Sequence, residues 1–183
     1  MFWQNKALAH AKEEDPKESC GLLINFKGKH IYEKCKNLST TAADQFILDP
    51  LDWASIEDKY GKDNIVAIIH SHPHTEPIPS LADRVSASRT GLKWWIVNPR
   101  TEVWNSFMPQ EYKASLIGRP WIWNITDCWS LVREYYQAEL NIKLKDYTRP
   151  NNPDDFISNP LFEKYFEDCG FIDVKDINDI QKH

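Results

Sequence analysis

Long apolar runs are missing from this sequence of 183 residues. The longest runs span about five or six residues, whereas a membrane-spanning helix needs about 20. Residues 1–10 also lack the charged-then-apolar order that is typical of a signal peptide, so we expect none. The four cysteines include no Cys-x-x-Cys pair and are too few for a disulfide scaffold. A reduced, cytoplasmic chain without a membrane span is therefore expected.

A basic surface is missing as well. The chain carries 22 basic and 27 acidic residues, a net charge of −5, without a long basic run. This balance argues against a nucleic-acid partner. Apolar residues make up 42% and charged residues 27% of the chain, as in ordinary soluble proteins. The length allows one medium domain or two small ones.

The most informative segment that is present runs from residue 64 to residue 83. Ile65 to Ile69 is a short, unbroken, β-branched apolar run that predicts a buried strand. His70 and His72 follow at alternate positions, so both imidazoles leave the same face of an extended chain. A proline-rich loop comes next, and Ser80 to Asp83 predicts the first turn of a helix.

Two imidazoles and one carboxylate, with a fourth position open to water, are what a catalytic zinc site requires. His70, His72 and Asp83 supply these three groups. Each piece has a simpler interpretation, because histidines at a strand end are often solvated or bonded to the backbone. Ser-x-x-Asp is also a helix capping box. The combination is what favours a metal site.

The remaining pattern of residues 1–109 predicts an α/β (α+β) fold, with a mixed sheet flanked by helices. Helices are predicted at residues 4–14, 51–60 and about 80–89, the last ending before Gly91. Besides the central strand, strands are predicted at residues 21–26, 30–35, 46–48, 93–97 and 102–107.

Residues 109–113 form a polar stretch and a candidate domain boundary. Beyond it, Thr126 or Asp127 caps a predicted helix, which presents an apolar stripe. The members of this stripe are Trp129, Val132, Tyr136 and Leu140. A short helix at residues 160–167 and a last strand at residues 170–174 are expected. Cys128 lies at the helix N-terminus, where the dipole stabilises a thiolate, although a lone cysteine is by default a buried apolar side chain.

The order His-Ser-His, seven residues and Ser-x-x-Asp resembles the signature of the JAB/MPN (JAMM) metalloproteases. Glu18, in the sequence Glu-Ser-Cys-Gly-Leu-Leu, resembles the upstream glutamate of that family. The resemblance covers residues 1–109 and implies a Zn²⁺ ion held by His70, His72 and Asp83. It also implies that Glu18 is the catalytic base and that Ser80 donates to the oxyanion. Metal-free JAB/MPN scaffolds exist, but they lack these ligands.

Residues 110–183 resemble the N-terminal part of an NlpC/P60 (papain-like) cysteine peptidase, a family that cuts peptidoglycan stem peptides. The resemblance rests on Cys128 within Asp-Cys-Trp-Ser-Leu-Val-Arg-Glu-Tyr-Tyr and makes Cys128 the catalytic nucleophile. A nucleophilic cysteine needs a histidine base. The only later histidine is His183, which lacks the expected strand context. The segment therefore looks truncated, and little cysteine-peptidase activity is expected.

A JAB/MPN domain followed by NlpC/P60 is the arrangement of the lambda K-type tail tip assembly proteins of long-tailed phages, which the whole chain resembles. This implies tail tip and hub proteins as partners, and a peptide substrate in peptidoglycan or a tail component. It also implies location in the host cytoplasm during assembly and then at the virion tail tip. Two hypotheses remain open: a zinc peptidase cutting a peptide or isopeptide bond, and a structural assembly factor that uses peptidase folds for docking. A deubiquitinase-like enzyme shares the motif, but the second segment argues against it.

Overall fold

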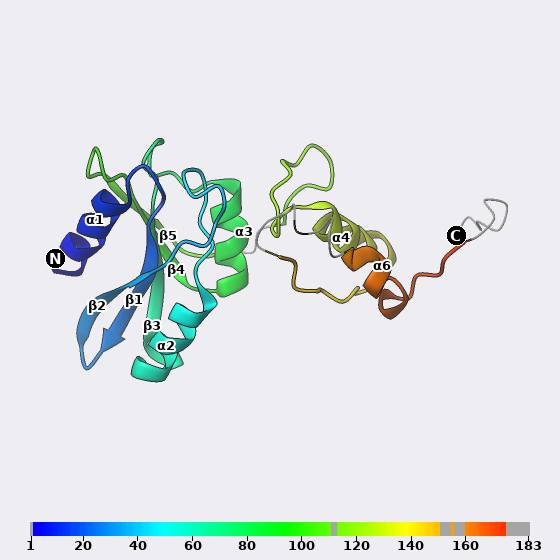
Figure 1. Cartoon of the computed structure of the whole chain (residues 1–183), viewed down its shortest axis with the longest axis horizontal. Coiled ribbons are helices and arrows are strands. Elements are labelled where there is room, and N and C mark those ends of the chain that lie inside the picture. The colour runs from blue at the N-terminus through cyan, green and yellow to red at the C-terminus, as the bar shows by residue number, and fades with distance from the viewer. Residues whose placement is uncertain (1, 111–112, 151–154, 156–159, 175–183) are drawn as a thin grey trace. The chain divides into compact units, whose positions relative to one another are not determined.

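The computed structural model describes residues 2–110, 113–150, 155 and 160–174. Contacts between Cα atoms divide the chain into two compact units, Met1–Ser115 and Leu116–His183. Figure 1 shows a sheet with helices in the first unit, and helices joined by extended segments in the second. Each unit is described by itself.

The first unit is organised around a five-stranded mixed sheet with the order β2-β1-β3-β4-β5. The strands are β1 (Cys20–Phe26), β2 (Lys29–Cys35), β3 (Ile65–Ser71), β4 (Lys93–Val97) and β5 (Trp104–Phe107). β3 and β4 are parallel, and the other neighbours are antiparallel. β1 and β3 lie inside the sheet, which explains why both are almost continuously apolar.

Helices cover both faces of this sheet (Figure 1). They are α1 (Phe2–Glu14), α2 (Pro50–Tyr60) and α3 (Leu81–Thr90). On one face, Trp3 and Ala7 of α1 pack with Leu23 and Ile69. On the other face, Ile56 of α2 and Ala87 of α3 pack with alternate residues of the strands, including Leu22, Ile68 and Trp94. This alternation confirms the predicted mixed sheet flanked by helices.

One predicted strand of this unit was wrong. Residues 46–48 do not form a strand, because Leu48 makes only an isolated bridge with Asn37. The backbone N–H of Ile47 donates to the side-chain Oδ1 of Asn37 at 3.0 Å, where a strand would use a neighbouring carbonyl. Asp49 then caps α2 by accepting from Leu51 N–H at 2.8 Å, which ends the extended segment.

The second unit contains the helix α4 (Cys128–Leu140), whose N-cap is Asp127. Asp127 accepts from the backbone N–H of Ser130 at 2.9 Å, so the predicted helix start is confirmed. Of its predicted apolar stripe, Trp129 is buried, but Leu140 is 50% exposed. No helix in the described ranges is both long and apolar enough to cross a bilayer.

The end of the described chain differs from the prediction. The short helix α6 (Leu161–Tyr165) is followed by the 3₁₀ turn η2 (Glu167–Cys169) instead of running to residue 167. Residues 171–174 are not a strand. The ring of Phe171 instead packs edge-on against Tyr136 of α4, with centroids 5.5 Å apart. Packing on a helix, rather than pairing with a strand, accounts for Phe171, whereas Ile172 is 84% exposed.

Candidate metal centre

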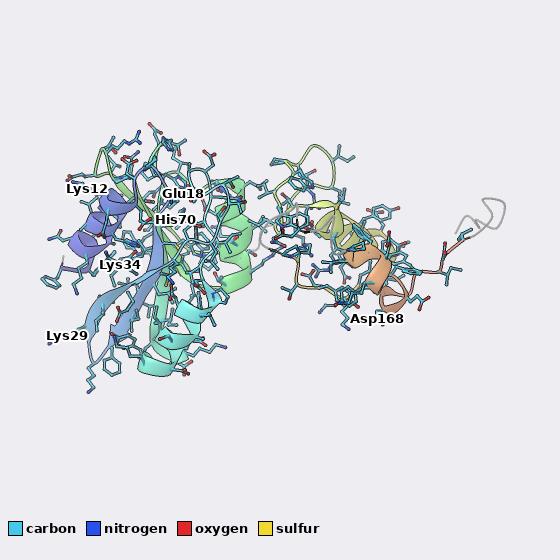
Figure 2. The ribbon with its side chains drawn as sticks, viewed as in Figure 1. Lys12, Glu18, Lys29, Lys34, His70 and Asp168 are labelled. Atoms are coloured by element: carbon cyan, nitrogen blue, oxygen red, sulfur yellow. The ribbon has the colours of Figure 1, made fainter. Side chains whose placement is uncertain are left out.

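The C-terminal end of β3 and the first turn of α3 bring three predicted ligands together. His70 lies in β3, His72 follows it, and Asp83 is the third residue of α3. The two Nε2 atoms are 3.1 Å apart. The Asp83 carboxylate oxygens lie 3.1 Å from His70 Nε2 and 3.4 Å from His72 Nε2. All three side chains are buried. Figure 2 locates His70 and Glu18 in this unit.

The geometry of these donors fits a zinc ion. One ligand atom from each of His70, His72 and Asp83 can be chosen so that all lie within 4.8 Å of one another. Donors about 2.0–2.2 Å from one tetrahedral zinc ion lie roughly 3.3–3.6 Å apart, close to the separations seen here. Two imidazoles and one carboxylate are also the donor set of many catalytic zinc sites. Within the described residues, this is the only such cluster.

The electrostatics of the cluster keep the carboxylate ionised. Burial by itself would raise the pKa of Asp83, but His70, His72 and the Ser80 amide together hold it well below its usual range. Burial opposes protonation of His72, yet its bonds to Asp83 and the charge of Glu18 leave its pKa raised. His72 Nδ1 lies 3.2 Å from the carbonyl of Glu76, which it can donate to while its Nε2 faces the centre.

Glu18 lies at the edge of this cluster. Its side chain is buried, and Oε1 is 3.9 Å from His72 Nε2. Burial raises the pKa of Glu18 to about 8, and the charge of Asp83 adds to this against the opposing effect of His72. The backbone N–H of Glu18 donates to the carbonyl of Ala42 at 2.7 Å. A carboxyl group whose pKa is near neutral, beside a cluster of potential metal ligands, suits proton transfer.

Ser80 is both the N-cap of α3 and a neighbour of the cluster. Its Oγ accepts from Asp83 N–H at 3.1 Å, and its own N–H donates to Asp83 Oδ2 at 2.7 Å, which completes a capping box. The Ser-x-x-Asp sequence therefore forms a helix capping box, which is its simpler interpretation. The same Asp83 carboxylate also faces the histidines. Ser80 is exposed, and its hydroxyl proton is left to donate elsewhere.

Several residues that hold the cluster in place were missed by the sequence interpretation. Ser71 Oγ accepts from Ser19 N–H at 2.8 Å. Asn98 donates its side-chain N–H to the carbonyl of Thr75 at 2.8 Å, next to the carbonyl that faces His72. Asn37 donates to the carbonyl of Glu18 at 2.9 Å. The position of Ser71 between two histidines could have marked it as part of the site. The partners of these contacts could not be predicted, because they are far apart in sequence.

Cys128, the predicted nucleophile, belongs to the second unit. It is the first residue of α4 and is exposed. The described part of this unit, residues 116–150, 155 and 160–174, contains no histidine, and His183 lies outside the described residues. A histidine base for Cys128 is therefore not found there. The NlpC/P60-like character of residues 110–183 stays a prediction.

Comparison with known proteins gives one family match and several relatives. A family model of prokaryotic homologs of the JAB domain matches residues 3–110. Tail tip assembly protein K of Escherichia phage N15 is 34% identical over 164 residues, covering 90% of this chain and 65% of that protein. Tail tip assembly protein K of Escherichia phage lambda is 32% identical over 105 residues, covering 57% of this chain and 48% of that protein.

A third relative comes from an archaeon. The desampylase of Haloferax volcanii is 31% identical over 105 residues, covering 52% of this chain and 76% of that protein. The chain spans 65% and 48% of the lengths of the two phage relatives. Since the JAB family match covers more than half of its residues, the chain belongs to the prokaryotic JAB-domain family and is a homologue of tail tip assembly protein K.

Proposed function

We propose that this chain is a zinc-dependent peptidase of the JAMM type that acts in phage tail tip assembly or cell-wall entry. The observation that carries the proposal is the convergence of His70, His72 and Asp83, with Glu18 3.9 Å from His72. A buried carboxylate pair with two imidazoles is costly to desolvate unless it binds a cation or serves chemistry. A relative named desampylase supports a hydrolytic activity.

A bound zinc ion would lower the pKa of a coordinated water to about 7 and polarise a substrate carbonyl. His70, His72 and Asp83 would hold the ion. Glu18 would accept the proton of the attacking water and return it to the leaving amine, so that the amine departs neutral. The Ser80 hydroxyl would donate a hydrogen bond to the developing oxyanion, a contribution of about 3–4 kcal/mol for one such donor.

The two phage relatives support the setting of this reaction. Both are named tail tip assembly protein K. Other tail tip and hub proteins are then the partners, in the host cytoplasm during assembly and afterwards at the virion tail tip. The substrate is a peptide or isopeptide bond in peptidoglycan or in a tail component.

A second function, a structural assembly factor without catalysis, is favoured by one observation. Cys128 has no histidine near it in the described part of its unit, so one of the two predicted catalytic centres lacks its base there. In that case both units would serve as docking surfaces. The two functions differ in whether the Glu18 carboxyl group is required: the peptidase needs it, and the structural assembly factor does not.

The test uses the zinc-loaded chain with two probes: cross-linked stem peptides released from purified peptidoglycan, and isolated tail tip proteins. Newly released primary amines and product masses are measured. Glu18→Gln should reduce the rate at least about 100-fold, since it removes the acid–base group. Glu139→Gln is the matched control, because Glu139 is exposed on α4, in the second unit.

The same variants can be placed in the phage. Tails that assemble and infect normally with Glu18→Gln would overturn the catalytic proposal and leave the structural function. Equal hydrolysis by Glu18→Gln and by the unaltered chain would overturn the role of Glu18, and no hydrolysis by the unaltered zinc-loaded chain would leave the structural function. Loss of infectivity with Glu18→Gln but not with Glu139→Gln would support the peptidase.

A further inference from the structure

Asn37, which follows β2, makes four hydrogen bonds through its side-chain amide. Nδ2 donates to the backbone carbonyls of Glu18 at 2.9 Å and Gln45 at 3.1 Å. Oδ1 accepts from the backbone N–H groups of Ser39 at 2.9 Å and Ile47 at 3.0 Å. Two carbonyls on one side and two N–H groups on the other fix the orientation of the amide. All the hydrogen-bonding capacity of the N–H₂ group is used.

Both halves of this amide contact the loop of residues 38–48, and the Nδ2 half also holds Glu18. The Oδ1 half fixes the loop of residues 38–48 onto itself, since Ser39 and Ile47 both belong to that loop. The Nδ2 half fixes Glu18, which comes just before β1, to the end of β2. A second bond strengthens the connection, because Glu18 N–H donates to Ala42 of the same loop.

This loop also reaches the metal ligands. The ring of Phe46 packs against the imidazole of His70, with centroids 4.7 Å apart, and against Trp94 at 5.6 Å. His70 is fully buried by such contacts. Asn37 therefore joins the backbone of Glu18 to the loop that covers His70, beside the direct bond from Glu18 N–H to Ala42.

We propose that Asn37 is a positioning residue that sets the distance between the carboxyl group of Glu18 and the cluster of His70, His72 and Asp83. The inference rests on the proposed peptidase function. The four hydrogen bonds of the Asn37 side chain reach neither the ligands nor the Glu18 carboxylate, and Asn37 acts through the Glu18 carbonyl. A displacement of about 1 Å at a catalytic group can reduce a rate about 100-fold, so a single backbone anchor is enough to matter.

Asn37→Asp separates the two halves of the amide. The substituted side chain keeps one oxygen for Ser39 and Ile47, but it places its second oxygen against the carbonyls of Glu18 and Gln45. Asn37→Ala removes both halves. The matched control is Asn105→Asp, because Asn105 is exposed on β5 and its Oδ1 accepts from the next residue, Ser106.

Three quantities are measured for each variant: kcat and KM of the zinc-loaded chain, zinc affinity by competition with a chelator, and amide hydrogen exchange by NMR. For Asn37→Asp we expect kcat to fall about 10- to 100-fold, as for outer partners of metal sites. KM and zinc affinity should change by less than about twofold, because ground-state binding is untouched. Exchange at Glu18 N–H should accelerate, while exchange at Ser39 and Ile47 stays slow.

Asn37→Ala should show the same fall in kcat, with faster exchange at Ser39 and Ile47 as well. Asn105→Asp should change none of these quantities. An unaltered kcat in Asn37→Asp, despite faster exchange at Glu18, would overturn the positioning role. Slow exchange at Glu18 in Asn37→Asp would overturn the anchor itself. If Asn37→Ala fails to fold, Asn37→Asp still decides between these outcomes.

Failure of the proposed peptidase function gives a different result. In that case the unaltered zinc-loaded chain releases no amine from either probe. The exchange measurement does not depend on hydrolysis, so it then decides by itself. Faster exchange at Glu18 with unchanged zinc affinity keeps Asn37 as the anchor of this residue, and unchanged exchange overturns the inference.

Discussion

Ser71 and Ser19 join the two sides of the candidate metal centre. Ser71 Oγ accepts from Ser19 N–H at 2.8 Å and lies 3.1 Å from Ser19 Oγ, and Ser71 N–H donates to the Ser19 carbonyl at 3.1 Å. Ser19 follows Glu18, and Ser71 lies between the two histidines. Both serines are buried. The pair therefore fixes the segment that carries Glu18 to the strand that carries His70.

Ser71→Ala should destabilise the protein and slow hydrolysis. The substitution leaves the buried N–H of Ser19 without its partner, which typically costs about 1–3 kcal/mol. Urea unfolding followed by tryptophan fluorescence measures the loss. Ser55→Ala is the control, because Ser55 is exposed on α2, and its free energy of unfolding should change by less than about 0.5 kcal/mol. Equal stability of the two variants would contradict the role of the pair.

Zinc should bind in a one-to-one ratio and raise the melting temperature. A ligand that binds only the folded state at 100 times its Kd adds about 2.7 kcal/mol of stability. His72→Ala removes one of three donors, so both the bound zinc and the thermal shift should disappear. His30→Ala is the matched control, because His30 is exposed on β2. Plasma mass spectrometry gives the metal content, and a zinc-bound His72→Ala chain would contradict the ligand assignment.

The parts of the site that follow chain-local rules could be predicted from the sequence. The apolar run before His70 predicts a central strand, and its period of two puts His70 and His72 on one face. The capping pattern at Ser80 predicts the start of α3, which places Asp83. These patterns depend on neighbours along the chain, so no tertiary information was needed.

The parts that failed depend on distant partners. Residues 46–48 have strand-like side chains, but Asn37 takes the N–H of Ile47 that a ladder would need. In residues 170–174, Phe171 packs on Tyr136 of α4 instead of facing a neighbouring strand. The contacts of Asn37 with Glu18 and of Ser19 with Ser71 link residues far apart in sequence. A single sequence contains no local pattern that predicts such contacts.

Cys128→Ala should leave zinc-dependent hydrolysis unchanged. Cys128 is exposed at the start of α4, and the described part of its unit supplies no histidine to activate it. The rate of amine release and the melting temperature are compared with those of the unaltered chain. A large loss of rate in a folded Cys128→Ala chain would show that this cysteine takes part in the reaction.

The stability of the first unit should fall below pH 6.5 because of His10. Burial lowers the pKa of His10, an effect to which Lys34 adds and which Glu14 opposes. His10 Nδ1 lies 2.9 Å from the Tyr32 hydroxyl, which can donate to the neutral ring. Below pH 6.5 the unfolded chain binds a proton that the native chain resists, so the free energy of unfolding decreases by at most about 1.4 kcal/mol per pH unit. Urea unfolding at pH 7.5 and pH 5.5 should show a smaller difference for His10→Gln than for the unaltered chain, whereas His30→Gln, at an exposed position, should keep the full difference.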